Sequence, residues 1–522
     1  MSEKSLIESE RKTPILYDVD VAVVGGGTAG TVAAIAAART GASTVLIEKF
    51  GSLGGCPTVG RCTHLGNTFI DKHLKRTMAG IPLEIMDRLV KAGGTTNSNL
   101  EELLTGRIKF SNFIIADPEI LAVILIEMAE EAGVKIMFHT LFCDAIMEED
   151  SVKGILVQSK AGRQAVLART VIDASGEADV ALSAGAPCRR GVEFSSSYGL
   201  LMRMGNVDVE KFLGYFLSLE AGKPNPEYTE WLSNYLGMST EILREDRYWS
   251  AYTDPQRVGL GVPTTHPGSQ FFNSETQRFF ESKWKTDGYF SYINMHFFRD
   301  LLRRAVENGD FELYRKVDDI GEITNHLDGF TSGLWRKGEV VLNAIRAQGA
   351  FDAFNIEHLT KIEIAARKRV IELTNFLRKY MPGWENCYIV DTGAITMPRH
   401  VCMIEGEYTL TMDDMQEGKT FNDAVFLGAS EITKDPPYGR PGFAFQAPYR
   451  MMVPKKIENL LVAGKCASGS PYVRAIPSIW AMGQAAGTAA ALACGKGVTP
   501  RQLDISELQK TLREQGAILD FD

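Results

Sequence analysis

The sequence has few of the features that mark secreted, membrane or nucleic-acid-binding proteins. Residues 1–14 are charged and polar, without the apolar core of a signal peptide. The only long apolar stretch, Pro477–Cys494, is rich in Gly and Ala and contains Ser478 and Gln484. A buried helix is therefore expected there in place of a membrane span. The net charge of −9 also disfavours nucleic acid and an anionic membrane as partners.

Paired cysteines are missing as well. The eight cysteines are scattered, with no C-x-x-C pair, which favours reduced thiols in a cytoplasmic protein. We expect no metal site. Hydrophobic residues make up 45 % and charged residues 23 % of the chain, as in ordinary globular proteins. A chain of 522 residues is too long for one ordinary domain, so more than one is expected.

What the sequence does contain is a strand, a glycine-rich turn, a helix and a second strand in succession. Asp18–Val24 is typical of a buried parallel strand, Thr31–Arg39 of a helix and Ser43–Ile47 of the second strand. The turn Gly25–Gly30 has the pattern G-x-G-x-x-G. This succession predicts a parallel sheet that binds a nucleotide.

The spacing within this unit suits a pyrophosphate and a ribose. Gly25 allows a tight turn, Gly27 lets phosphates approach the backbone, and Gly30 lets the helix pack close to the sheet. The N–H groups of the helix N-terminus face the phosphates. Glu48 lies 18 residues after Gly30, where a carboxylate accepts hydrogen bonds from ribose hydroxyls. We therefore predict that the unit binds ADP-ribose.

The rest of the chain predicts one α/β domain interrupted by an insertion. Residues 15–190 and 386–500 form the two parts of an FAD-binding domain, residues 191–385 an inserted, largely helical cap that holds the substrate, and residues 501–522 a helical tail. The expected helices are Ile81–Lys91, Pro118–Ala132, Asp208–Glu220, Pro226–Leu236, Asn294–Asn308, Ile356–Tyr380, one from Pro477, and Ser506–Gln515. The expected strands are Val134–Phe138, Leu141–Ile146, the hairpin Val152–Gln158 with Gln164–Ala168, Thr170–Gly176, Gly406–Met412 and Asn459–Gly464.

Two stretches far apart in the chain are suited to complete one extended cofactor site. Val171–Gly176 and Asn459–Gly464, about 290 residues apart, each end a strand with small residues. The helix from Pro477 carries Gly483 and Gly487 on one face, where another backbone can pack closely. Its N-terminus could stabilise negative charge on a reduced isoalloxazine ring. This two-part layout favours FAD over NAD.

Several stretches carry a resemblance to a known family: VAVVGGGTAGTVAAIAAARTGASTVLIEKFGSLGG, AGIPLEIMDRL, VIDASGEADVALSAGAP, EYTLTMDDMQEGKTFNDAV, and PYRMMVPKKIENLLVAGKCAS followed by VRAIPSIWAMGQAAGTAAALA. They resemble FAD-dependent oxidoreductases related to succinate dehydrogenase and fumarate reductase flavoproteins. The resemblance implies a Rossmann-like FAD-binding domain of the glutathione-reductase type. We expect hydride transfer between flavin N5 and a small organic substrate, and an electron donor or acceptor that the sequence does not identify. Homo-oligomerisation is compatible with the sequence.

The same resemblance implies which residues line FAD. Together with Thr28 and Ala29 of the first turn, they are Gly25, Gly27, Gly30, Glu48, Lys49, Gly54, Gly55, Phe142, Ser175, Gly176, Asp179, Gly464, Lys465, Pro477, Ser478 and Ile479. One family motif is altered. Where the family often carries G-V-R-E-S-R-R, Met397–Met403 retains Arg399 but has His400 in place of the acid and Cys402 in place of an arginine. If the family's arginines bind an anionic substrate, this protein acts on a different one.

Five side chains are candidates for the chemistry beside the flavin. Arg474 precedes the flavin-facing helix and either holds a substrate oxygen or forms a structural salt bridge. Arg399 and His400 adjoin in the altered motif, and His400 is either an acid–base group or a structural histidine. His64 follows the second glycine-rich loop, and Tyr472 lies two residues before Arg474. Each of these two is either an active-site group or an ordinary packing residue.

Two other functions stay open. Cys56 and Cys62 could form the redox pair of a flavin-dependent disulfide reductase, but five residues including Pro57 separate them, which puts them on different faces of a helix. The sequence also has no second G-x-G-x-x-G for NADPH. Alternatively, FAD has a structural role in a non-redox hydration or isomerisation. Mixing the protein with substrate or reductant without oxygen distinguishes a redox function from a non-redox one, because a redox enzyme must bleach its flavin during turnover.

Overall fold

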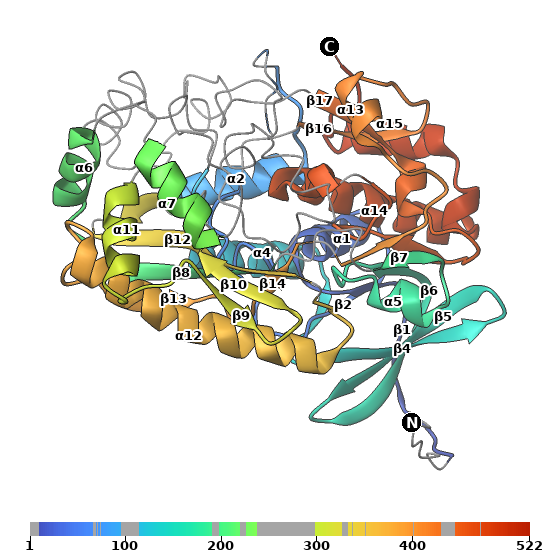
Figure 1. The fold of residues 1–522 in the computed structure, drawn as a ribbon. Helices are drawn as coiled ribbons and strands as arrows, with labels where there is room; N and C mark the ends of the chain where they lie inside the picture. Colours follow the sequence, from blue (N-terminus) through green and yellow to red (C-terminus); the bar gives the residue numbers. More distant parts are fainter. Residues whose placement is uncertain are drawn as a thin grey trace.

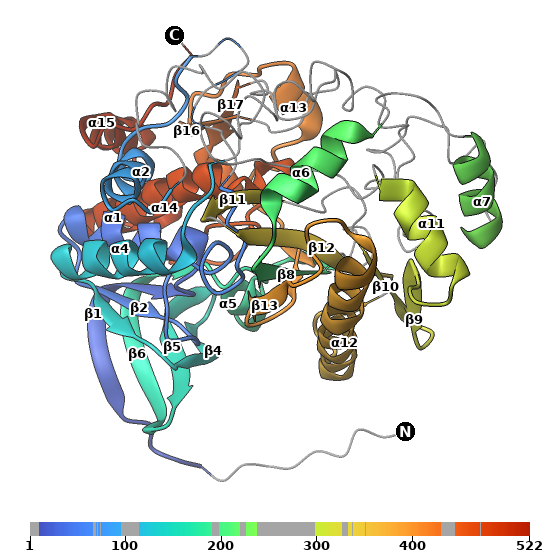
Figure 2. The same cartoon turned by 90° about the vertical axis from the view of Figure 1, so that its left-hand side faces the viewer.

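The computed structural model is an α/β molecule built around two large sheets (Figure 1, Figure 2). It describes residues 10–521 except 66–68, 70, 72, 74, 96–113, 191–197, 220–225, 237–297, 326–331, 337, 350, 400, 430–443 and 470. The first sheet is formed by residues near both ends of the chain, and the second by residues from its middle.

The first sheet joins a parallel part to an antiparallel part. Its strands run in the order β3, β2, β1, β6, β5, β4, and β18 also pairs with β6. The strands are β1 (Ile15–Val24), β2 (Thr44–Ile47), β3 (Lys135–Met137), β4 (Leu141–Glu148), β5 (Ser151–Ser159), β6 (Gly162–Asp173) and β18 (Leu460–Val462). The two segments expected as Gln164–Ala168 and Thr170–Gly176 form the single strand β6. Its first half pairs with β5 and its second half with β18.

The parallel register brings the carboxyl ends of four strands to one edge. Val24 of β1 lies opposite both Ile47 of β2 and Asp173 of β6. Val462 of β18 lies on the other side of Asp173. The loops that follow these strands therefore leave the sheet side by side. In open parallel sheets this edge is where ligands bind.

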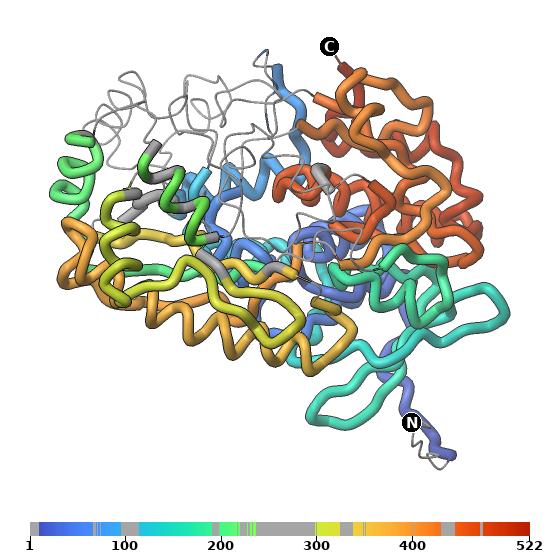
Figure 3. Tube along the Cα trace, in the orientation of Figure 1, coloured from blue at the N-terminus to red at the C-terminus, as the bar shows by residue number. Residues whose placement is uncertain are grey.

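Two helices cross at close range against this sheet. They are α1 (Thr28–Arg39) and α14 (Ile476–Lys496). Figure 3 shows these two segments, blue and red, next to each other. A Cβ atom at Gly483 would lie 2.3 Å from the carbonyl oxygen of Ala29, and one at Gly487 would lie 2.0 Å from that of Ala33. No side chain fits at such distances. The predicted small face of α14 is therefore confirmed as the contact with α1.

The other elements of this part pack around the first sheet, most of them in one hydrophobic core with α1 and α14, whereas α5 belongs to a second core. They are α2 (Ile81–Lys91), α4 (Pro118–Glu131), α5 (Asp179–Ser183), α13 (Met412–Gln416), α15 (Ile505–Glu514), β16 (Ala424–Ala429), β17 (Ala444–Pro448), and the 3-10 turns η4 (Tyr449–Met452), η5 (Pro471–Arg474) and η6 (Pro500–Gln502). The tail helix α15 buries Leu508 and Leu512 in the core with α1 and α14. Asp504 caps α15 by accepting a hydrogen bond from the Ser506 N–H.

The region expected to be largely helical contains the second sheet. Its strands run in the order β13, β8, β12, β10, β9, with β11 on β12 and β14 on β8. They are β8 (Tyr198–Gly205), β9 (Tyr314–Val317), β10 (Gly321–Asn325), β11 (Ser332–Arg336), β12 (Glu339–Gly349), β13 (Tyr388–Thr392) and β14 (Met397–Pro398). The expected helices are present as α6 (Val209–Ser218), α7 (Pro226–Leu236), α11 (Arg299–Glu307) and α12 (Ile356–Tyr380). The expectation of a largely helical cap was incomplete, since it missed the sheet.

The central strand β12 shows why the sheet was missed. Val340, Val341 and Leu342 are consecutive and all buried, so the strand does not alternate between apolar and polar residues. Such a run cannot be told from a buried helix by its period. Moreover, β13 and β14 come after residue 385 and pair with β8, so the second sheet extends beyond the range 191–385.

The predicted strand Gly406–Met412 was wrong. Gly406 and Leu410 form only isolated bridges, and α13 begins at Met412. The reason is a capping box, in which the Thr411 side chain accepts the Asp414 N–H and the Asp414 side chain accepts the Thr411 N–H. The nearby short strand is β15 (Cys402–Ile404), which pairs with β7 (Cys188–Arg190).

The contact between α1 and α14 predicts opposite effects for two glycine replacements in the same helix. Gly487→Ala should lower the free energy of unfolding by about 1–3 kcal/mol, because the added methyl group overlaps the Ala33 carbonyl. Gly495→Ala should raise it by up to about 1 kcal/mol, because no atom lies within 4 Å of the added methyl group and alanine favours a helix. Thermal unfolding midpoints of both variants test this. Equal midpoints would contradict the close contact.

Candidate functional site

The turn between β1 and α1 is shaped for a ligand with phosphate groups. Gly25 has φ +98°, and a Cβ there would lie 2.5 Å from the Ala174 carbonyl oxygen. No side chain caps the N-terminus of α1, so its first N–H groups remain for an anion. A Cβ at Gly27 would meet only the Cα of Gly55, at 4.0 Å. The space beside Gly27 is therefore open, as the approach of a pyrophosphate requires.

The second glycine-rich loop packs on the first, backbone against backbone. The Gly54 N–H donates to the Gly26 carbonyl at 2.8 Å, and the Thr28 hydroxyl donates to the Gly54 carbonyl at 3.1 Å. A Cβ at Gly55 would lie 2.8 Å from the Cα of Gly27. The structure therefore brings Gly27, Thr28, Gly54 and Gly55 together, as expected from the sequence.

Glu48 lies at the end of β2, with its carboxylate pinned to two backbone groups. One oxygen accepts the Gly26 N–H at 2.7 Å and the other accepts the Phe50 N–H at 2.7 Å. Burial raises the pKa of Glu48, while these hydrogen bonds lower it. A carboxylate has about four acceptor positions. Glu48 therefore keeps capacity for the hydroxyls of a ribose.

The end of β6 is held by an acid that sequence reasoning did not single out. Asp173 is fully buried and accepts hydrogen bonds from the Ser175 N–H, the Ser175 hydroxyl and the Ala181 N–H at 2.6–3.0 Å. Burial raises the pKa of Asp173 to about 6. The expected residues Ser175 and Gly176 thus lie in a turn organised by this acid. Its position at the last residue of a buried strand was a signal for this role.

A second acid, Glu177, binds the expected residue Lys465. The Lys465 ammonium lies 2.6 Å from the Glu177 carboxylate and donates to the Pro398 carbonyl at 2.6 Å. Burial raises the pKa of Glu177, and the Lys465 charge opposes that shift. Lys465 therefore connects the loop after β18 with the turn after β6 and with β14.

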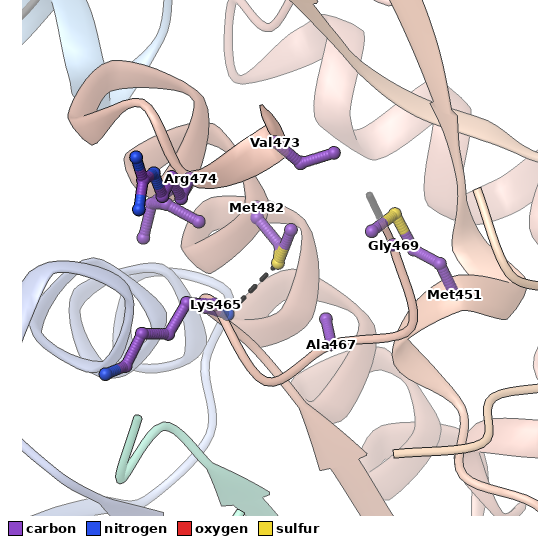
Figure 4. A pocket seen from close by; sticks show the side chains of 9 residues that line it. Met451, Lys465, Ala467, Gly469, Val473, Arg474 and Met482 are labelled. Carbon is purple, nitrogen blue, oxygen red and sulfur yellow. Dashed lines mark hydrogen bonds between the residues drawn. The ribbon is translucent and has the colours of Figure 1, made fainter. Parts of the chain in front are cut away.

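A small pocket lies between the loop after β18 and the beginning of α14. Lys465 and Arg474 line one side, Met451 and Gly469 line the other, and Met482 lies between them (Figure 4). The Gly464 N–H donates to the Met482 sulfur at 3.1 Å, which fixes the loop against the helix.

The first turn of α14 carries an orphaned polar group. Ser478 is fully buried, and its hydroxyl has no hydrogen-bond partner among the described residues. A buried hydroxyl of this kind normally finds a partner. Ser478 was expected to contact the cofactor, and its neighbours Pro477 and Ile479 are buried with it. The helix begins at Ile476, one residue before the expected Pro477.

The loop between Gly55 and His64 contains both cysteines of the possible redox pair, which were expected on different faces of a helix. Residues 56–60 form turns, not a helix, so the argument from helical faces does not apply. The Cys62 N–H donates to the Cys56 carbonyl at 3.0 Å, and the Cys62 thiol donates to the His64 backbone carbonyl at 3.9 Å. His64 is buried, and its side chain lowers the pKa of the Cys62 thiol.

The Cys56 thiol lies in the field of several cations. Its pKa is lowered by interaction with Cys62 and by the charges of Lys465, Arg474 and Arg399, against the effect of burial. The pKa of Cys62 is raised by its hydrogen bond to Cys56 and by burial. The structure thus brings three expected residues, Arg399, Arg474 and His64, close to this loop.

The remaining expected residues divide into two groups. Phe142 is half-buried in β4, and Asp179 begins α5 with its N–H donating to the Ser175 hydroxyl at 2.9 Å. Burial raises the pKa of Asp179, and the nearby Lys49 opposes this. His400 and the side chain of Tyr472 lie outside the described residues.

Comparison with known proteins defines the class. Residues 20–512 match the family described as FAD dependent oxidoreductase, so the chain belongs to that family and its cofactor is FAD. The glycine loops, Glu48 and the buried hydroxyl of Ser478 fit this cofactor. No helix in the described ranges has the length and hydropathy to span a membrane.

Individual relatives are similar over part of the chain. The digeranylgeranylglycerophospholipid reductase of Methanosarcina acetivorans is 31% identical over 246 residues, 47% of this chain and 54% of the relative. The thiamine thiazole synthase of Methanococcus maripaludis strain C7 is 30% identical over 171 residues, 31% of this chain and 57% of the relative. The chain thus aligns with only about half the length of these relatives.

Solved structures with lower sequence identity are also similar to this chain. A geranylgeranyl bacteriochlorophyll reductase-like protein from Thermoplasma acidophilum is 14% identical, with a TM-score of 0.39 over 96% of this chain and 84% of that protein. A myxobacterial chondrochloren halogenase, described as FAD-dependent, is 11% identical, with a TM-score of 0.37 over 96% of this chain and 79% of that protein.

The open space beside Gly27 predicts a variant that folds but does not hold the cofactor. Gly27→Val should lose most bound FAD, because its side chain fills the space that the pyrophosphate needs while meeting only Gly55. The absorbance of FAD per protein measures this, with far-ultraviolet circular dichroism as the folding control. Normal FAD content in Gly27→Val would refute the site.

The raised pKa of Asp173 predicts a pH dependence of stability. The folded protein holds a proton on Asp173 up to about pH 6, above the range where an unfolded aspartate releases it. This contribution to stability is complete at low pH and is lost as the pH rises through 6. The unfolding midpoint of the native protein should therefore rise more between pH 7 and pH 5 than that of Asp173→Asn, whose side chain does not titrate. Parallel pH profiles would contradict the burial of a titrating acid.

Proposed function

We propose that the protein transfers two electrons between FAD and a small organic molecule held between the first and second sheets. The observation that carries the proposal is the meeting of four distant segments at one sheet edge. They are Gly25–Gly30, Gly54–Cys56, Asp173–Glu177 and Gly464–Ser478. The first two would hold the pyrophosphate, and the last two would adjoin the flavin ring.

FAD, when bound, supplies hydride transfer at flavin N5. The residues of the chain supply orientation and charge. Arg474 would hold a substrate oxygen or the charge of the reduced cofactor, since its guanidinium stays protonated and offers a planar fork of donors. Arg399 would add a second cation, and His64 would move a proton at its ring nitrogen. The N-terminus of α14 would add partial positive charge through its N–H groups.

We further propose a domain organisation close to the one expected from the sequence, with residues 15–190 and 386–500, apart from β13 and β14, around FAD, residues 191–385 together with β13 and β14 as the substrate domain, and residues 501–522 as a tail. The relationship to succinate dehydrogenase and fumarate reductase flavoproteins and the glutathione-reductase type of the fold belong to this proposal. So do a cytoplasmic location, a separate electron partner and homo-oligomerisation. His400 and Tyr472 stay candidates for proton transfer.

Anaerobic substrate screening tests the function. The purified protein is mixed with small organic acids, alcohols, thiols and disulfides, and with geranylgeranyl compounds because one relative is named as a reductase of such a lipid. A substrate should bleach the visible absorbance of the flavin, or restore that absorbance after chemical reduction. Turnover of a substrate without any change in flavin absorbance would favour the non-redox alternative.

Arg474 should raise the reduction potential of bound FAD. Arg474→Ala should keep FAD but lower its reduction potential by about 30–60 mV, because loss of a nearby cation disfavours the reduced anionic form by roughly ten- to a hundredfold. Arg474→Lys should recover part of the loss. Arg450→Ala is the matched control, since Arg450 pairs with Asp423 at 2.9 Å away from the pocket. An unchanged potential with a lower unfolding midpoint would make Arg474 a structural residue.

A further inference from the structure

We propose that Cys56 and Cys62 form a redox-active dithiol–disulfide couple that exchanges two electrons with a disulfide substrate beside the FAD site. The inference rests on the proposed function and names a substrate class for it. Its basis is the geometry of the loop, since the Cys62 N–H donates to the Cys56 carbonyl at 3.0 Å and thereby brings the two residues face to face across the loop. A disulfide needs Cα atoms roughly 4.4–6.8 Å apart, which a direct backbone hydrogen bond favours.

The loop is held in this shape from both sides. The Gly60 N–H donates to the Gly55 carbonyl at 3.0 Å, and the Ala394 N–H donates to the Val59 carbonyl at 2.9 Å. Arg61, at the tip, forms ion pairs with Glu119 at 2.8 Å and with Asp391 at 3.1 Å. The cysteines are therefore positioned between the FAD-binding part and the second sheet.

The two thiols differ in the way that a redox pair requires. Interaction with Cys62 and the charges of Lys465, Arg474 and Arg399 lower the pKa of Cys56 and favour its thiolate. Interaction with Cys56 and burial raise the pKa of Cys62, which therefore keeps its proton. Both residues are partly exposed. Cys56 is thus the attacking thiolate and Cys62 the resolving thiol.

The exchange balances in two steps. The Cys56 thiolate attacks one sulfur of the substrate R–S–S–R, which forms a mixed disulfide and releases one thiolate RS⁻. The released RS⁻ takes the proton of Cys62, and Cys62 attacks the Cys56 sulfur, which forms the Cys56–Cys62 disulfide and releases the second RS⁻. The protein pair has lost two electrons, and the substrate has become two thiols after protonation. Reduced FAD, when bound, would supply the two electrons and one proton that return the pair to a Cys56 thiolate and a Cys62 thiol.

The chain offers a matched pair of thiols for comparison. Cys188 and Cys402 lie on the paired strands β7 and β15, but Cys402 is opposite Arg190 and Cys188 is opposite Ile404. The two cysteines are therefore diagonal neighbours, about 7–8 Å apart, which is farther than the Cα atoms of a disulfide usually lie. Cys188 and Cys402 are therefore expected to stay reduced where Cys56 and Cys62 oxidise.

The test equilibrates the FAD-loaded protein with glutathione buffers of graded oxidised-to-reduced ratio, then alkylates remaining thiols and digests with trypsin. Cleavage after Lys49, Arg61 and Lys72 places Cys56 on the peptide 50–61 and Cys62 on the peptide 62–72. In the native protein these two peptides should stay joined at oxidising ratios and separate on reduction. The peptides with Cys188 and Cys402 should carry the alkyl label throughout.

Two variants check the order of the steps. Cys62→Ser should stop at a glutathione adduct on Cys56. In Cys56→Ser, Cys62 should react with the alkylating reagent on the order of tenfold more slowly than Cys56 reacts in Cys62→Ser, because the Cys62 thiolate is disfavoured.

Separate, fully labelled 50–61 and 62–72 peptides at every ratio would overturn the couple, as would equal oxidation of Cys188 and Cys402. FAD absorbance is measured in parallel: absent FAD refutes the proposed function, whereas normal FAD with separate peptides refutes this inference alone.

Discussion

The fold depends on one close contact, the approach of α1 and α14 that Gly483 and Gly487 permit. Carbonyl oxygens of Ala29 and Ala33 occupy the space where side chains of α14 would otherwise lie. This contact joins residues near the two ends of the chain across more than four hundred positions. Because α14 is fixed against α1, the loop that precedes it is fixed beside the glycine-rich turn that precedes α1. The site therefore exists only in the assembled domain.

The acids around the site are placed so that they do not oppose the phosphates of FAD. Glu48 binds the Gly26 and Phe50 N–H groups, Asp173 binds the turn after β6, and Glu177 binds Lys465. Each acid is hydrogen-bonded to backbone groups or paired with a cation, which offsets part of the cost of burying it. In contrast, the N-terminus of α1 is left uncapped by side chains. The N–H groups at this end of α1 are therefore left for the phosphates.

The second sheet supports the side of the site opposite the cofactor domain. β13 and the segment after it hold the cysteine loop through the Ala394 N–H and through the ion pair of Arg61 with Asp391. Met397 of β14 packs so tightly on Gly60 that a Cβ there would lie 2.1 Å from its sulfur. Only glycine fits at that position. A loop clamped in this way can present two thiols and a histidine in fixed relation to Arg399 and Arg474.

The sequence by itself determined the local units whose signals lie within a short window. The turn Gly25–Gly30 and the helix Ile356–Tyr380 were predicted correctly, because each depends on neighbouring residues. Only the tertiary structure decided that β12 is a strand, since both of its faces are buried, and that Thr411 begins a helix. Only the structure paired Cys56 with Cys62, because their proximity depends on a turn held by residues of α4 and β13 far along the chain. The spacing of residues in the sequence indicates helices and strands, whereas contacts between loops far apart in the chain depend on how those elements pack.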